Sequence, residues 1–112
     1  MLFRSITKGN VALLRRLAEL YVNQTAEQLA LLKNALSERS AADVQRIGHR
    51  CTGSSGTIGM IAMANLFEKL EHAGKNGQMQ VAEQLTTEIE SAFVGVRASV
   101  KALAAAPSEA KA

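Results

Sequence analysis

His49 stands in the part of this 112-residue chain whose residue types and spacing most favour chemistry. On a helix over residues 41–58, with about 100° per residue, one face carries the core positions Val44, Ile47, Cys51, Ser54, Ser55 and Ile58. His49 lies roughly 170° from the centre of that face, so its imidazole is predicted to face solvent. A solvent-facing, titratable imidazole can serve as a nucleophile toward a partner protein.

Glycines accompany the histidine on the same predicted helix. Gly48, Gly53 and Gly56 each cost about 0.5–1 kcal/mol relative to alanine in a helix interior. Gly53 and Gly56 follow His49 by one and two turns on its own face. Their missing side chains are predicted to leave the imidazole open to another protein.

A plainer interpretation of the same segment is that it is a linker. Residues 53–57 read Gly-Ser-Ser-Gly-Thr, which is a typical linker composition, and a lone surface histidine usually has no chemical role. Ile58 and Met60, however, continue the helical phase of the preceding apolar stripe. A flexible linker has no need of that phase, which favours a helix.

The elements that must position His49 are amphipathic helices. The first begins after Asn10, a predicted N-cap, and its apolar stripe is Val11, Leu14, Ala18, Tyr21, Thr25, Leu29, Leu32 and Leu36. A second row is predicted to widen that apolar face: Leu13, Leu17, Leu20 and Leu31. The polar run from Ser37 to Ser40 marks a turn, and Ser40 with Asp43 resembles a capping box at the start of the His49 helix.

Two further helices follow the His49 helix, which we expect to end at Gly59. One runs from Met60 to Ala73 and is followed by a predicted turn over 74–77. The last continues from Ala82 to about Leu103. Four helices joined by short turns predict an all-α, antiparallel, up-down-up-down four-helix bundle over residues 10–105. Residues 1–9 form an N-terminal segment, and residues 106–112, with Pro107, form a flexible C-terminal tail.

Composition narrows the functional classes. The single cysteine, Cys51, is predicted to be a core residue and indicates a reducing cytoplasm, and no apolar stretch approaches the length of a membrane span. The net charge of +3 is spread along the chain, so nucleic-acid binding is not predicted. His49 and His72 lack ligand spacing, so no metal site is predicted, and Met60, Met63 and Met79 are expected to fill core gaps.

The segment from His49 to Gly59 resembles the signature of the histidine-containing phosphotransfer (HPt) domains of multistep phosphorelays. That signature reads His, any residue, an apolar residue, usually Lys, then Gly-Ser-Ser, three variable positions and Gly. The chain has His-Arg-Cys-Thr-Gly-Ser-Ser-Gly-Thr-Ile-Gly. The resemblance continues without a gap through the next helix to Leu70, Glu71 and Gly74.

The resemblance implies that His49 accepts a phosphoryl group through Nε2 from a receiver-domain aspartate and passes it to another receiver. Glu71 falls where the family places a residue that fixes the histidine tautomer, and Lys75 where a basic residue can approach the phosphoryl oxygens. Thr52 departs from the family's lysine, so Arg46 or Lys75 is expected to supply the missing charge.

In such relays the receiver, which belongs to a response regulator or a hybrid histidine kinase, holds Mg²⁺. The chain itself is therefore expected to be a cytoplasmic, monomeric phosphohistidine carrier with no cofactor and no independent catalytic activity.

Two other functions remain open at this stage. The chain could be an interaction module that binds a receiver or sensor with little phosphotransfer, which Thr52 favours. It could also be the dimerisation helix pair of a sensor kinase. That function predicts an obligate dimer, whereas four helices in one chain can close a core alone.

Overall fold

The structure is a computed structural model that describes residues 10–105 of the chain. Four helices occupy this range: α2 (Val11–Ser37), α3 (Ala41–Thr57), α4 (Ile61–Lys75) and α5 (Met79–Ala105). No strand occurs among these residues, so the predicted all-α class is confirmed. The predicted N-terminal segment 1–9 and C-terminal tail 106–112 lie outside the described residues.

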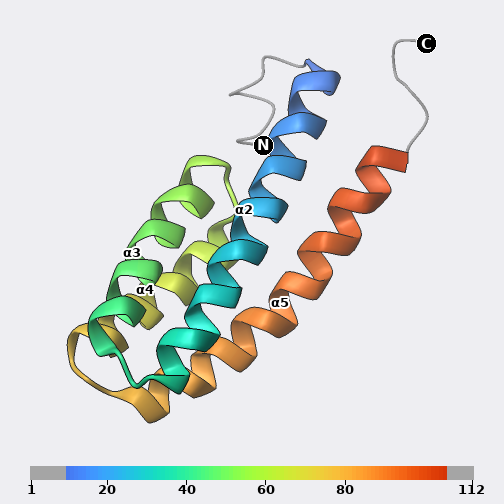
Figure 1. The fold of residues 1–112 in the computed structure, drawn as a ribbon. Coiled ribbons are helices and arrows are strands. Elements are labelled where there is room, and N and C mark those ends of the chain that lie inside the picture. The colour runs from blue at the N-terminus through green and yellow to red at the C-terminus, as the bar shows by residue number, and fades with distance from the viewer. Residues whose placement is uncertain (1–9, 106–112) are drawn as a thin grey trace.

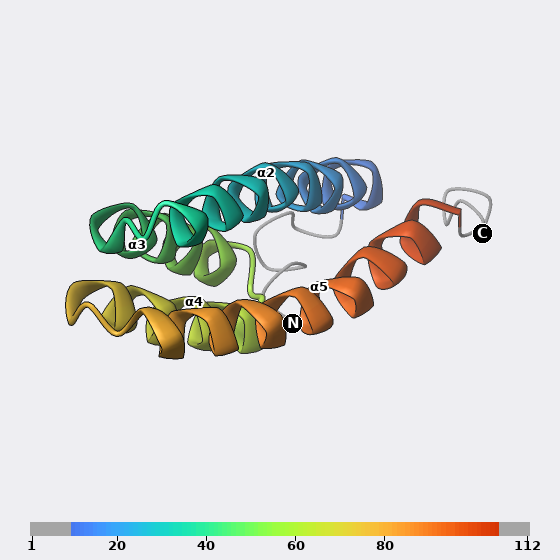
Figure 2. The same ribbon diagram turned by 60° about the horizontal axis from the view of Figure 1, so that its bottom comes forward.

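The helices form an antiparallel bundle in which each packs against its neighbours in the chain. α2 contacts α3, α3 contacts α4, and α4 contacts α5, while α2 and α5 also pack together and close the bundle (Figure 1). α2 and α5 have 27 residues each, but α3 has 17 and α4 has 15. One half of each long helix therefore extends beyond the shorter pair (Figure 2).

Local sequence signals define the helix ends. The side chains of Asn10 and Ser40 accept hydrogen bonds from the backbone N–H groups three residues later, at 2.9 and 3.4 Å. Gly59 and Gly77 adopt φ values of 85° and 68° after α3 and α4, where glycine is favoured over residues with a Cβ. The predicted caps at Asn10 and Ser40 and the stop at Gly59 are therefore confirmed.

The core contains residues from all four helices. Its largest fully buried side chains are Phe67, Leu32, Met63, Leu70, Ile89, Val44, Cys51 and Ser55. Ser55 bonds the hydroxyl of Tyr21 on α2 at 2.7 Å, which satisfies two buried polar groups and links α3 to α2. Met63 and Met79 are buried and Met60 is half-buried, as predicted.

The second apolar row predicted on α2 is largely wrong. Leu13, Leu20 and Leu31 are 40%, 48% and 51% exposed, and Leu17 is half-buried. α2 meets its neighbours through the stripe that contains Ala18, Tyr21, Thr25, Leu29 and Leu32. Leu13 and Leu20 of the other row are exposed, and Leu31 lines an open groove between α2 and α3.

We call the line along which α3 and α4 meet at Gly48 and Gly74 the seam. A Cβ atom built at Gly48 would lie 2.6 Å from the backbone nitrogen of Glu71, and one at Gly74 would overlap the backbone nitrogen of Gln45. Both glycines are buried. The prediction that Gly74 and Lys75 begin a turn is therefore wrong: both belong to α4, and Gly74 permits close helix packing.

Candidate functional site

His49 lies on the exposed face of α3, opposite the core. Its side chain is 79% exposed, whereas Val44, Ile47 and Cys51 on the same helix are buried. The helical phase read from the sequence therefore holds through residues 53–57, which belong to α3 and not to a linker. Burial raises the pKa of the Cys51 thiol to about 12, so at neutral pH Cys51 is an uncharged core side chain.

Glu71 on α4 holds the histidine ring from the side. The Nδ1 atom of His49 lies 2.9 Å from Oε2 of Glu71, whose side chain is 25% exposed. When the imidazole is neutral and Nδ1 carries the proton, Nδ1–H donates to the carboxylate and Nε2 keeps its lone pair. Among residues 10–105 nothing hydrogen-bonds Nε2, so that nitrogen is open to a reaction partner.

The seam sets the distance between these two side chains. Gly48 is the residue before His49, and its missing Cβ lets the backbone of Glu71 approach α3. A larger residue at position 48 would push α4 away, because the nearest atoms belong to backbone that cannot rotate aside. The His49–Glu71 contact therefore depends on a glycine that the sequence pattern left without a role.

Gly53 and Gly56 extend the exposed face of α3 beyond His49, and we call His49, Gly53 and Gly56 together the free face. A Cβ atom added at either glycine would meet nothing within 4 Å. Neither glycine is needed for packing within the described chain. This arrangement agrees with the clearance predicted from the sequence, although a role in partner access stays a prediction.

The remaining predicted site residues, Thr52, Arg46 and Lys75, differ in their positions relative to His49. The hydroxyl of Thr52 donates to the carbonyl oxygen of Gly48 at 2.7 Å, so it is engaged within α3. Arg46 lines a shallow hollow that contains His49 and is completed by Ala42, Gln45 and Glu71. Lys75 is exposed near the end of α4 and does not line that hollow.

Arg46 also forms an ion pair that the sequence analysis did not identify. Its guanidinium lies 2.6 Å from Oδ1 of Asp43, one turn earlier on α3. A hydrogen bond from Ser40 and then the contact with Arg46 hold the pKa of the Asp43 carboxyl below its usual range. Asp43 was noted only as part of a cap, but its i, i+3 spacing from Arg46 is a recognisable signal for such a pair.

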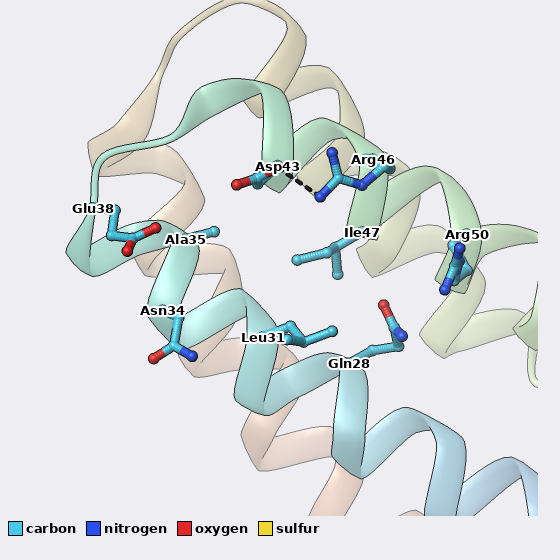
Figure 3. A pocket seen from close by; sticks show the side chains of 9 residues that line it. All are labelled: Gln28, Leu31, Asn34, Ala35, Glu38, Asp43, Arg46, Ile47 and Arg50. Atoms are coloured by element: carbon cyan, nitrogen blue, oxygen red, sulfur yellow. Dashed lines mark ion pairs between the residues drawn. The ribbon is translucent and has the colours of Figure 1, made fainter.

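A groove between α2 and α3 lies beside this pair (Figure 3). Leu31 and Ala35 of α2 and Ile47 of α3 contribute its apolar walls, and Arg46 and Arg50 contribute positive charge along α3. Arg46 is the residue shared by this groove and the His49 hollow. Leu31, which the sequence pattern predicts in the core, is half-exposed and lines this groove.

Within residues 10–105, no three His, Cys, Asp or Glu side chains lie close enough together to hold a metal ion. None of the described helices combines the length and apolar character needed to cross a membrane.

Comparisons with known proteins find similarity in both sequence and overall fold. A family model described as "Hpt domain" matches residues 16–106. The chain is also similar to the crystal structure of histidine-containing phosphotransfer protein B (HptB) from Pseudomonas aeruginosa PAO1, with a TM-score of 0.84 and 25% sequence identity. That match covers 89% of this chain and 87% of the other. No match was found among curated proteins.

Proposed function

The chain belongs to the Hpt domain family, and on that premise we propose that His49 accepts a phosphoryl group from a receiver-domain aspartate and passes it to a second receiver. Family membership supports a histidine phosphotransfer role in phosphorelays. The observation that carries the choice of residue is the exposed His49 ring, bonded through Nδ1 to Glu71 at 2.9 Å. His72, the other histidine, is exposed on α4 without a comparable contact in the described chain.

The proposed transfer needs one nucleophile and one leaving group. The Nε2 lone pair of neutral His49 attacks the phosphorus of an aspartyl phosphate, a nitrogen–phosphorus bond forms, and the bond from phosphorus to the aspartate oxygen breaks. The bonding electrons return to the aspartate as a carboxylate. The proton on Nδ1 stays in its hydrogen bond with Glu71, whose negative charge stabilises the cationic phosphorylated ring.

The second half of the relay is the same step in reverse. A carboxylate of another receiver attacks the phosphorus, and the electrons of the nitrogen–phosphorus bond return to Nε2. Phosphoryl transfer of this kind depends mainly on positioning and charge stabilisation. Mg²⁺ and the acidic residues that bind it belong, in this proposal, to the receiver, so the chain acts as a carrier without independent catalysis or cofactor.

The proposal also covers the partners, the cellular location and the oligomeric state of the chain. The partners are receiver domains of response regulators or hybrid histidine kinases, in the cytoplasm. A monomer is supported by the closed core that the four described helices form from one chain. A mass measurement in solution tests this part: an obligate dimer would favour the sensor-kinase helix pair instead.

The central test is phosphotransfer from a panel of phosphorylated receivers. Acid-labile label is expected on the wild-type chain and is expected to disappear in His49→Gln. His72→Gln is the matched control, because it removes the other histidine and should keep the label. A receiver that binds the chain tightly but transfers no label would identify an interaction module instead of a carrier.

A further inference from the structure

A phosphoryl group on His49 would place new negative charge on an exposed helix face. The HPt signature usually has a lysine three positions after the histidine, but this chain has Thr52 there. Its hydroxyl is neutral, and it is already donated to the carbonyl oxygen of Gly48 at 2.7 Å. Thr52 therefore cannot neutralise the phosphoryl group, and a cation must come from elsewhere in the chain or from solvent.

Arg46 is placed to be that cation. It precedes His49 by three residues on α3, a spacing that puts the two Cβ atoms about 5–6 Å apart. Side chains on a helix lean toward its N-terminus, so the His49 ring leans over the turn that carries Arg46. Both residues line the same shallow hollow together with Glu71. Lys75 and Arg50 do not line it.

In the unphosphorylated chain the Arg46 guanidinium already has an anionic partner. It lies 2.6 Å from Oδ1 of Asp43 (Figure 3), which is three residues before Arg46 on α3, whereas His49 is three residues after it. The side chains of this pair are 68% and 36% exposed, so water screens the attraction and the contact is weak enough to break. Arg46 also borders both the groove that contains Asp43 and the hollow that contains His49, which gives the guanidinium two places to lie.

We propose that Arg46 exchanges its carboxylate partner Asp43 for the phosphoryl oxygens when His49 is phosphorylated. The exchange rests on the proposed function of His49, and no covalent bond changes in it. A phosphoryl group carries more negative charge and more acceptor oxygens than one carboxylate, so the guanidinium gains by moving. Arg46 thus takes over, from the preceding turn, the role that a lysine at position 52 would have.

The test uses phosphoramidate, a small phosphoryl donor, so that no partner protein affects the result. The chain is phosphorylated, the donor is removed, and the half-life of phosphohistidine and its ³¹P chemical shift are measured at fixed pH. Arg46→Ala is expected to shorten the half-life about 2- to 5-fold, the upper part of the range that an exposed ion pair provides, and to shift the resonance. Arg46→Lys is expected to restore most of the half-life.

Arg50→Ala is the matched control, because it removes the same charge from the neighbouring face of α3. Its half-life and chemical shift should equal those of the wild type. The exchange would be overturned if Arg46→Ala had the half-life and chemical shift of the wild type. It would also be overturned if Arg46→Ala and Arg50→Ala shortened the half-life equally. Absence of label on wild-type His49 would instead overturn the proposed function, so the two failures are distinguishable.

Asp43→Asn examines the resting partner. It should lengthen the half-life in the presence of Arg46, because the guanidinium is released, and it should have a smaller effect when combined with Arg46→Ala. Equal effects of Asp43→Asn in the two backgrounds would show that Asp43 and Arg46 act independently, which contradicts the exchange.

Discussion

The seam and the free face use glycine for opposite purposes. At the seam, Gly48 and Gly74 are buried, and a Cβ atom at either position would collide with the backbone of the facing helix. On the free face, Gly53 and Gly56 have open space where a Cβ would be. One set of glycines lets two helices of this chain approach, and the other has open space beside it within residues 10–105.

Because of this difference, the orientation of the His49 ring and the access to its Nε2 atom depend on different glycines. The seam determines how close Glu71 comes to Nδ1 of His49, so it controls the orientation of the ring. In the proposed function, the free face determines which parts of a partner can reach Nε2. Substitutions at the seam should therefore disturb the fold and the site together, whereas substitutions on the free face should affect encounters with a partner and spare the fold.

The largest expected effect is on stability, in Gly48→Ala. The added methyl group meets the backbone of Glu71, so the free energy of unfolding should fall by about 1–3 kcal/mol. Gly53→Ala is the matched control on the same helix, and it should raise that free energy by about 0.5–1 kcal/mol. Urea denaturation measures both, and equal changes would remove the distinction between the two kinds of glycine.

Gly53→Leu tests accessibility without disturbing the seam. The larger side chain would stand one turn beyond His49 on the free face, so transfer from a phosphorylated receiver should slow at least about 10-fold. Phosphorylation by phosphoramidate, which needs little room, should stay close to the wild-type rate. Full receiver transfer in this variant would show that partners do not approach across Gly53.

Glu71→Gln tests the seam side of the site. The amide oxygen can still accept a hydrogen bond from Nδ1–H, but the negative charge that stabilises the phosphorylated ring is lost. Phosphorylation of His49 by phosphoramidate should slow about 2- to 5-fold. Glu68→Gln, one turn earlier on α4 and exposed, is the control and should leave the rate unchanged.

The smallest expected effect belongs to Lys75→Ala. Lys75 lies on α4 outside the hollow that contains His49, so the half-life of the phosphorylated form should change less than about 2-fold. The same half-life measurement that is applied to Arg46→Ala checks this. A larger loss in Lys75→Ala than in Arg46→Ala would assign the phosphoryl group to the cation on α4.

Much of the bundle could be predicted from periodicity alone. The stripe through Ala18, Tyr21, Thr25, Leu29 and Leu32 is buried as expected. The connections at 38–40 and 58–60 fall where polar residues and Gly59 interrupt the helical pattern. Leu20 and Leu31 were misassigned because apolar residues beside a stripe are buried only if a neighbouring helix covers them. That coverage depends on how α3 and α5 are placed around α2.

The direction in which His49 points was determined by the sequence itself, because a helix fixes the angle between His49 and the apolar residues around it whatever packs nearby. The packing roles of Gly48 and Gly74 were decided only by the tertiary structure. The sequence alone does not distinguish a glycine that ends a helix from one that lets the backbone of another helix approach. Distances between helices, which no local pattern contains, separate those cases.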